Sequence, residues 1–299
     1  MSLYQPGILA KPVPSQARYM FFALKSVEAL PAALDALSQW VDGSSVVAGL
    51  GSPLVLALGA KVQGLRVFPA LNAMVENPST QHALWLWLLG DDRGELLHRS
   101  QAIETALAPA FHLLQVTEGF RYDTDRDLTG YEDGTENPVD QAAVEAAIVA
   151  NAGPGLDGGS FVAIQQWQHD LNGFAALPSV EQDNIMGRRK SDNEELDDAP
   201  VSAHVKRTAQ ESFSPEAFIV RRSMPWIESG NSGLMFVAFG RTLNAFEVQL
   251  RRMSGLEDGI PDALYRFSRP LNGGYYWCPP LKDGRLDLSA IRSAETRAS

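Results

Sequence analysis

Cysteine is almost absent from this chain of 299 residues, which contains only Cys278. A single thiol excludes an internal disulfide, a zinc site built from several cysteines, and the C-x-x-C-H attachment of a c-type haem. Any cofactor must therefore be held without a covalent bond. Cys278 itself lies in the bulky apolar run Tyr275–Pro280, where we expect an inert, buried thiol.

Basic residues and long apolar runs are also scarce. The chain has 25 Lys and Arg against 36 Asp and Glu, a net charge of −11, which disfavours nucleic acid and anionic membrane surfaces as partners. The longest apolar run, Ala83–Leu89, is far shorter than the roughly 20 residues that span a bilayer. The first residues resemble no secretory signal, so we expect a cytoplasmic protein without a membrane partner.

The order of predicted elements repeats in two halves. With 45% hydrophobic and 20% charged residues the chain is typical of a globular protein, and the Gly-rich stretch 153–159 separates the halves. Each half reads as strand, helix, strand, strand, helix, strand. We therefore predict an α+β fold of two ferredoxin-like domains, 1–152 and 153–299, with antiparallel four-stranded sheets.

Individual elements follow from hydrophobic periodicity. Apolar residues at helical spacing predict helices over 30–41, 93–107 and 243–253, and a shorter helix over 179–186 with Ser179 as its cap. The strands predicted are 19–24, 84–89, 111–116, 161–167, 217–222 and 234–239, with strand or loop over 46–57. The charged stretch 188–198 should be a surface loop.

Two stretches resemble ligand-binding motifs, but each lacks a feature that the binding site needs. Residues 153–158 match G-x-G-x-x-G, but a strand follows where a dinucleotide site needs a helix, so a linker is the better interpretation. Asp123, Asp125 and Asp127 begin like a calcium loop, yet Leu128 occupies the position of the required glycine.

The histidines give no paired zinc spacing. We expect His82, His98 and His169 at the surface because their neighbours are polar, and His112 in the core because its neighbours are apolar. His204 follows the charged loop, and Arg221 comes shortly after it. The loop 130–138 carries Asp133 between glycines that permit close approach to a ligand.

These elements together resemble the dye-decolourising peroxidase family, in its compact bacterial cytoplasmic subgroup. Gly130-x-x-Asp133-Gly134 continuing to Pro138 is similar to the family's signature, His204 matches its haem-ligating histidine, and Arg221 its distal arginine. The likeness runs from about Gln5 to Leu281. It departs from many relatives at Ser223, where asparagine is common.

The resemblance implies a haem b (iron protoporphyrin IX) peroxidase that reduces hydrogen peroxide and oxidises aromatic donors by one-electron steps. The haem would lie in the C-terminal half, with His204 as proximal iron ligand and Asp133 and Arg221 as distal catalytic residues. Asp262 would accept a hydrogen bond from His204, with Asp258 as the alternative acceptor. The remaining haem contacts implied are Gly134, Glu136, Arg188, Leu234 and Phe236, and a homo-oligomer is expected.

Two rival functions stay open. A haem carrier or iron-releasing protein would need His204 and an apolar pocket, but neither a distal acid nor an arginine. Chlorite dismutation would need the arginine without the aspartate loop. Because Asp133 and Arg221 are both present, peroxidase activity is favoured over both rivals.

Overall fold

The computed structural model describes residues 3–71 and 73–292. Within that part of the chain, no helix is long and apolar enough to cross a membrane. The strands are β1 (Gln16–Leu24), β2 (Val46–Gly51), β3 (Leu84–Gly90), β4 (Phe111–Phe120), β5 (Ser160–His169), β6 (Val220–Arg221), β7 (Met224–Glu228), β8 (Asn231–Gly240), β9 (Ser268–Pro270), β10 (Gly274–Cys278), β11 (Leu281–Lys282) and β12 (Arg285–Leu286). The helices are α1 (Leu30–Trp40), α2 (Ser52–Ala57), α3 (Arg93–Leu107), α4 (Asp140–Ala147), α5 (Leu171–Ala175), α6 (Ser179–Met186), α7 (His204–Arg207) and α8 (Asn244–Met253).

Most of the strands form one antiparallel sheet that closes on itself. Its order is β6-β8-β7-β4-β1-β3-β2-β10-β5-β9, and β5 pairs in addition with β8, with Ile164 opposite Val237. The antiparallel pairing agrees with the prediction, but the expected separation into two sheets is wrong. Hydrogen bonds join the halves through β4 with β7 and through β2 with β10.

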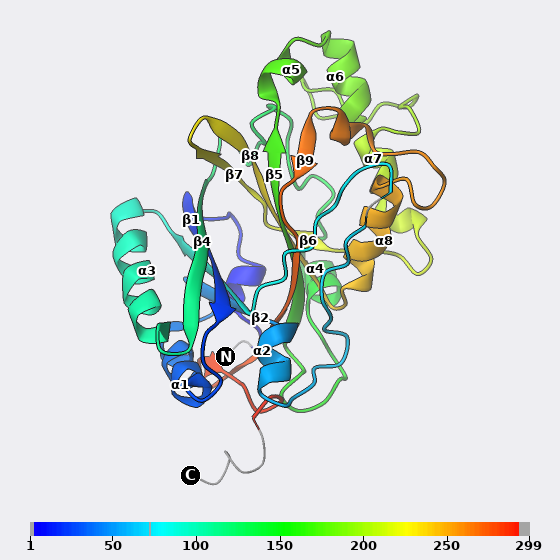
Figure 1. Ribbon diagram of the computed structural model, residues 1–299. Coiled ribbons are helices and arrows are strands. Elements are labelled where there is room, and N and C mark those ends of the chain that lie inside the picture. The colour runs from blue at the N-terminus through cyan, green and yellow to red at the C-terminus, as the bar shows by residue number, and fades with distance from the viewer. Residues whose placement is uncertain (1–2, 72, 293–299) are drawn as a thin grey trace.

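Each half nevertheless keeps its own order of strands. The first four strands lie in the order β4-β1-β3-β2. In the second half the corresponding strands lie in the equivalent order β10-β5-β8-β7. In Figure 1, α1 and α3 lie together on one side of the sheet, while α7 and α8 lie together on another. The second pair of helices borders the site described below.

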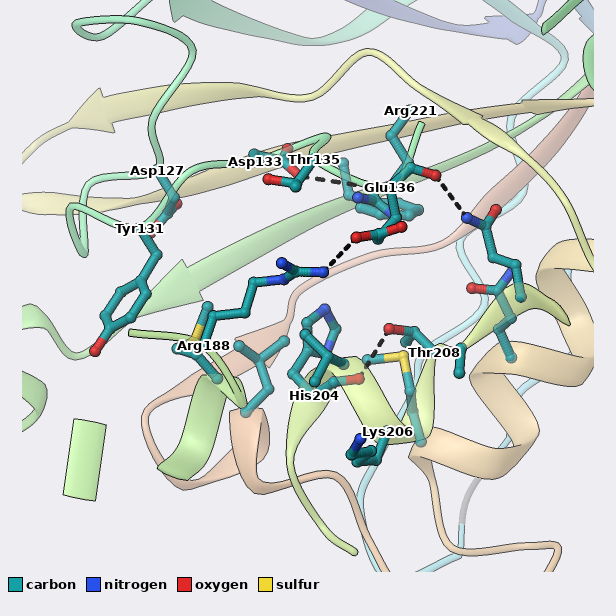
Figure 2. Close-up of a pocket in the computed structure, with 18 of the residues that line it drawn as sticks. Asp127, Tyr131, Asp133, Thr135, Glu136, Arg188, His204, Lys206, Thr208 and Arg221 are labelled. Carbon is teal, nitrogen blue, oxygen red and sulfur yellow. Dashed lines mark hydrogen bonds and ion pairs between the residues drawn. The ribbon is translucent and has the colours of Figure 1, made fainter. Parts of the chain in front are cut away.

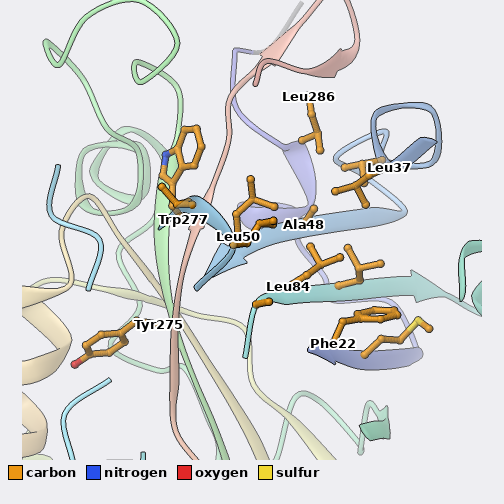
Figure 3. Packing of buried hydrophobic residues seen from close by; sticks show 14 of the residues in the cluster. Phe22, Leu37, Ala48, Leu50, Leu84, Tyr275, Trp277 and Leu286 are labelled. Carbon is orange, nitrogen blue, oxygen red and sulfur yellow. The ribbon is translucent and has the colours of Figure 1, made fainter. Parts of the chain in front are cut away.

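Both faces of the closed sheet are buried, which explains the apolar run in β3. Leu84, Leu86 and Leu88 point into the core beneath the helices, where they join Phe22, Leu37 and Leu50 (Figure 3). The alternate residues Trp85 and Trp87 point inside the ring of strands, where they stack with Tyr19 and Tyr276. A strand between two apolar layers has no polar face, so its sequence does not alternate.

Three predicted elements differ from the structure. Residues 46–57 contain the strand β2 and then the helix α2, with Pro53 in the first helical turn, where its missing N–H costs nothing. The predicted strand 217–222 shortens to β6, because Ala217 N bonds outside the sheet to Gln210 O. Ser179 begins α6 but does not cap it, since Pro178 holds the N-cap position and no side chain caps that end.

Candidate functional site

The predicted site residues gather around a cavity of ≈ 510 Å³. It lies between α7, α8, strands β5 and β8, and the loop 127–136 (Figure 2). Seven of the predicted site residues line it: Asp133, Glu136, Arg188, His204, Arg221, Leu234 and Phe236. Gly134 and Asp262 were also predicted at the site but are not among the lining residues. Segments separated by about a hundred residues in the chain thus meet at one place.

His204 begins the short helix α7 and is anchored at two points. Its carbonyl oxygen accepts hydrogen bonds from the backbone N–H and the hydroxyl of Thr208. Its Nδ1 lies 2.8 Å from Oδ2 of Asp262, whose side chain is completely buried behind it. An imidazole that donates Nδ1–H to a carboxylate presents the lone pair of Nε2, which is the atom available to ligate a metal in the cavity.

Asp258 has a different partner. Both of its carboxylate oxygens lie 2.7 Å from the guanidinium of Arg207, which also donates to the carbonyl oxygen of Arg252. Hydrogen bonding from Arg207 lowers the pKa of Asp258 below its ordinary value. Asp262 therefore contacts His204, whereas Asp258 fixes the end of the helix on which His204 lies.

Asp133 and Arg221 meet on the opposite side of the cavity from His204, as Figure 2 shows. The Nε of Arg221 lies 3.5 Å from Oδ1 of Asp133, and the side chains are only 17% and 25% exposed. The Asp133 N–H donates to the carbonyl oxygen of Asp125. Gly134 follows with φ of +79°, a backbone conformation that favours glycine, and so turns the chain immediately after the carboxylate.

Asn137 holds the backbone of Arg221 in place, although no role was predicted for its side chain. Its amide donates to Arg221 O (3.0 Å), and its amide oxygen accepts from Arg221 N (2.7 Å). Gln210 makes a similar link, since its side chain donates to Glu136 O and accepts from Ile219 N. The Asn-Pro pair at 137–138 was the available signal, but it marks a turn in most proteins.

The rim of the cavity is charged and one wall is apolar. Arg188 forms an ion pair with Glu136 and donates to Asn193 O, while Lys206 pairs with Glu195. Arg188 lies at the start of the predicted surface loop, but its side chain forms part of the cavity wall and is only 13% exposed. Leu234 and Phe236 of β8 supply the apolar wall.

Two histidines are placed contrary to expectation. His169 is buried, with hydrogen-bonding partners Asp127 and Ser268, because residues distant in sequence surround it. His112 is exposed, because it occupies an outward position of β4 although its neighbours are apolar. Cys278 is buried as predicted, and burial raises the pKa of its thiol, which disfavours the reactive thiolate.

Comparison with known proteins places the chain in a family. The family model for the C-terminal part of Dyp-type peroxidases matches residues 124–283. A dye-decolorizing peroxidase of Mycolicibacterium paratuberculosis is 32% identical over 244 residues, which cover 79% of this chain and 69% of the relative. One of Mycobacterium tuberculosis is 30% identical and covers 79% and 73%.

Solved structures agree with these relatives. A putative Dyp-type peroxidase of Shewanella oneidensis superposes with a TM-score of 0.86 at 28% identity, over 94% of this chain and 97% of that one. A DypB variant of Rhodococcus jostii RHA1 in complex with heme gives a TM-score of 0.79 at 25% identity, covering 91% and 94%. The shared fold and the matched sequence over most of both lengths lead to one conclusion: the chain belongs to the dye-decolorizing peroxidase family.

Proposed function

We propose that this chain is a haem b peroxidase that reduces hydrogen peroxide and oxidises aromatic donors one electron at a time. The observation that carries the proposal is the opposition of His204 to the Asp133–Arg221 pair across one cavity. One side offers a metal ligand, and the other offers an acid–base group and a fixed positive charge. A haem carrier has no use for the second set of residues.

The residues present fit a haem. The cavity volume of ≈ 510 Å³ lies within the range of about 300–1,000 Å³ that is usual for ligand sites. His204 would ligate iron through Nε2, Leu234 and Phe236 would face the porphyrin, and Arg188 at the rim would pair with one of its carboxylates. Glu136 and Gly134 would border the distal side.

The buried carboxylate of Asp262 would set the character of the ligand. By accepting the Nδ1 proton it raises the basicity of His204 and fixes the ring orientation. When bound, haem would supply the iron redox chemistry that splits the peroxide bond.

The chain's own residues would manage protons and charge on the other side. Asp133 would accept a proton from one oxygen of hydrogen peroxide and return it to the other, which then leaves as water. Arg221, which stays charged, would stabilise the negative charge that develops on the departing oxygen. Asn137 holds the backbone of Arg221, which fixes the point from which its side chain extends into the cavity.

The two halves of the chain have distinct parts in this proposal. The equivalent strand orders β4-β1-β3-β2 and β10-β5-β8-β7 support two ferredoxin-like units, over 1–152 and 153–299. The second unit would hold the haem through His204, while the first contributes the loop with Asp133. Homo-oligomeric assembly and a cytoplasmic location stay predictions.

An absorption spectrum tests the proposal directly. The purified protein reconstituted with haem should show a Soret band that changes on addition of one equivalent of hydrogen peroxide. The Soret band should then return to its starting position as an aromatic dye is added and oxidised. A protein that binds haem but leaves peroxide and dye unchanged would be a carrier instead.

A further inference from the structure

A second hollow lies behind the wall of the cofactor cavity. This outer groove, of ≈ 650 Å³, is bordered by β9, the start of α5 and the turn between β7 and β8. His169 and Phe267 line both the groove and the cavity. Of these two shared side chains, only His169 can carry a proton.

His169 is hydrogen-bonded at both ring nitrogens. Nδ1 lies 2.6 Å from the hydroxyl of Ser268, which lines the groove, and Nε2 lies 3.1 Å from Oδ2 of Asp127, which lines the cavity. The His169 side chain is 5% exposed. Ser268, His169 and Asp127 therefore form one continuous hydrogen-bonded chain between the two spaces.

The fold fixes both ends of this chain. Ser268 stands opposite His169 in the pairing of β9 with β5. Asp127 accepts from the backbone N–H and the hydroxyl of Thr129 through its other oxygen. Burial raises the pKa of Asp127, but His169 and Thr129 lower it by more, so the carboxylate favours its ionised form and readily passes on a proton that it receives.

Proton supply is a requirement of the proposed reaction. Reduction of hydrogen peroxide follows H₂O₂ + 2 H⁺ + 2 e⁻ → 2 H₂O, so each turnover consumes two protons inside the cavity. A donor too bulky to enter delivers electrons from outside and leaves its own protons there. The protons and the electrons of one turnover then reach the cavity by different routes.

We propose that His169 conducts protons from the outer groove into the cofactor cavity, by way of Ser268 and Asp127. Ser268 passes its proton to Nδ1 and takes another from water in the groove, while the ring releases its Nε2 proton to Asp127, so the imidazole gains one proton and loses one. Rotation of the neutral ring then restores the starting tautomer before the next transfer. Asp127 and Asp133 line the same cavity, which lets water pass the proton between them. The inference rests on the proposed peroxidase function.

Other roles for these three residues fit less well. The order Ser–His–Asp is that of a hydrolase triad, but Ser268 is only 2% exposed and lies within a strand pairing, where no substrate carbonyl reaches it. The charged side chains of the groove have their own partners: Asp170 accepts from Gly173 N, Arg266 pairs with Glu181, and Arg269 donates to Gln168. Asp127 is the charged group that contacts the imidazole.

The decisive variant is His169→Gln in the haem-loaded enzyme. A glutamine can donate to Asp127 and accept from Ser268, which preserves the contacts but cannot relay a proton. With ferrocyanide, which gives up an electron and no proton, an indicator dye in stopped flow reports proton uptake from the buffer. We expect uptake and turnover to fall by about 100-fold, the lower end of what a positioned proton-transfer group contributes. Exposed His98→Gln is the matched control and should change neither.

Chemical rescue separates proton transfer from structure. In His169→Gly, an added hindered base that is a poor iron ligand, 2,6-lutidine, should restore turnover in a concentration-dependent manner and should leave wild type unchanged. Full activity of His169→Gln, or a slow glycine variant that 2,6-lutidine does not rescue, would overturn the proposal. If wild type itself consumed no peroxide, the proposed peroxidase function would be wrong, whatever the role of His169.

A measurement without turnover gives an independent check. Nuclear magnetic resonance of the ¹⁵N-labelled ring should show a His169 N–H that exchanges with solvent faster as buffer concentration rises. A ring proton that persists for days in D₂O would show that the path is closed and would overturn the proposal.

Discussion

The carboxylate of Asp262 lies 2.8 Å from Nδ1 of His204, although 58 residues separate them in the chain. Asp258, only four residues before Asp262, turns instead to Arg207. The two carboxylates therefore have separable tasks, one acting on the proposed ligand and the other on the helix that carries it.

Replacing Asp262 by Asn should alter the haem while sparing the fold. The amide keeps the shape of the side chain but removes the negative charge that raises the basicity of His204. Changes to such supporting groups typically cost about 10- to 100-fold in affinity or activity. A shifted Soret band and a raised reduction potential should accompany the loss.

Asp258→Asn is the control for that experiment. It should lower the thermal midpoint, since the buried guanidinium of Arg207 loses its ion pair, but leave the haem spectrum unchanged. The reverse pattern, with spectral change only in the Asp258 variant, would contradict the assignment.

His204→Ala should lose most of its haem yet remain folded. The side chain belongs to none of the buried apolar clusters, so its removal leaves the core intact. Haem content by absorption and folding by circular dichroism check the two halves of the statement. Exposed His98→Ala should bind haem normally, and full haem content in the His204 variant would exclude it as the ligand.

Arg221→Leu should slow the reaction with peroxide by about 10²- to 10³-fold, the usual cost of removing one donor to a developing anion. Haem loading should stay near normal because the charge acts on the reacting oxygen. Stopped-flow spectra at increasing peroxide give the rate. Exposed Arg241→Leu serves as the comparison, and equal rates in the two variants would refute the role.

Asn137→Ala should reproduce part of the Arg221 defect without touching its charge. Loss of both hydrogen bonds frees the backbone that positions the guanidinium. A double-mutant cycle with Arg221→Leu should be strongly non-additive, because the two residues act as one unit. Additive effects on the peroxide rate would place Asn137 in a separate role.

The individual helices and strands could be predicted from the sequence better than the closure of the sheet. The leucines of β3 mark a buried strand, but nothing local states that β5 and β8 pair and close the sheet. His169 illustrates the same limit at the site. Its neighbours in sequence are polar, whereas its partners Asp127 and Ser268 lie 42 and 99 residues away. Asp133, Arg221 and His204 were selected as candidates because the resemblance supplied a pattern that local chemistry lacks.

Stability in acid should depend on Asp127. Its pKa is lowered in the folded chain, so the unfolded chain binds the proton more readily. Its contribution is therefore complete above the unfolded-state pKa and is lost as pH falls through the folded-state pKa. Hydrogen bonds to a charged group contribute about 1.5–3 kcal/mol, which sets the scale of the loss.

Urea unfolding at a series of pH values measures this contribution. Asp127→Asn should be less stable than wild type at neutral pH, and the difference should shrink as the solution becomes acidic, because wild type loses what the variant already lacks. The exposed Asp198→Asn should follow the wild-type curve. If the unfolding free energies of wild type and Asp127→Asn stayed parallel into acid, His169 and Thr129 would not stabilise the ionised carboxylate. The ionised state of Asp127 in the proposed proton path would then lose its support.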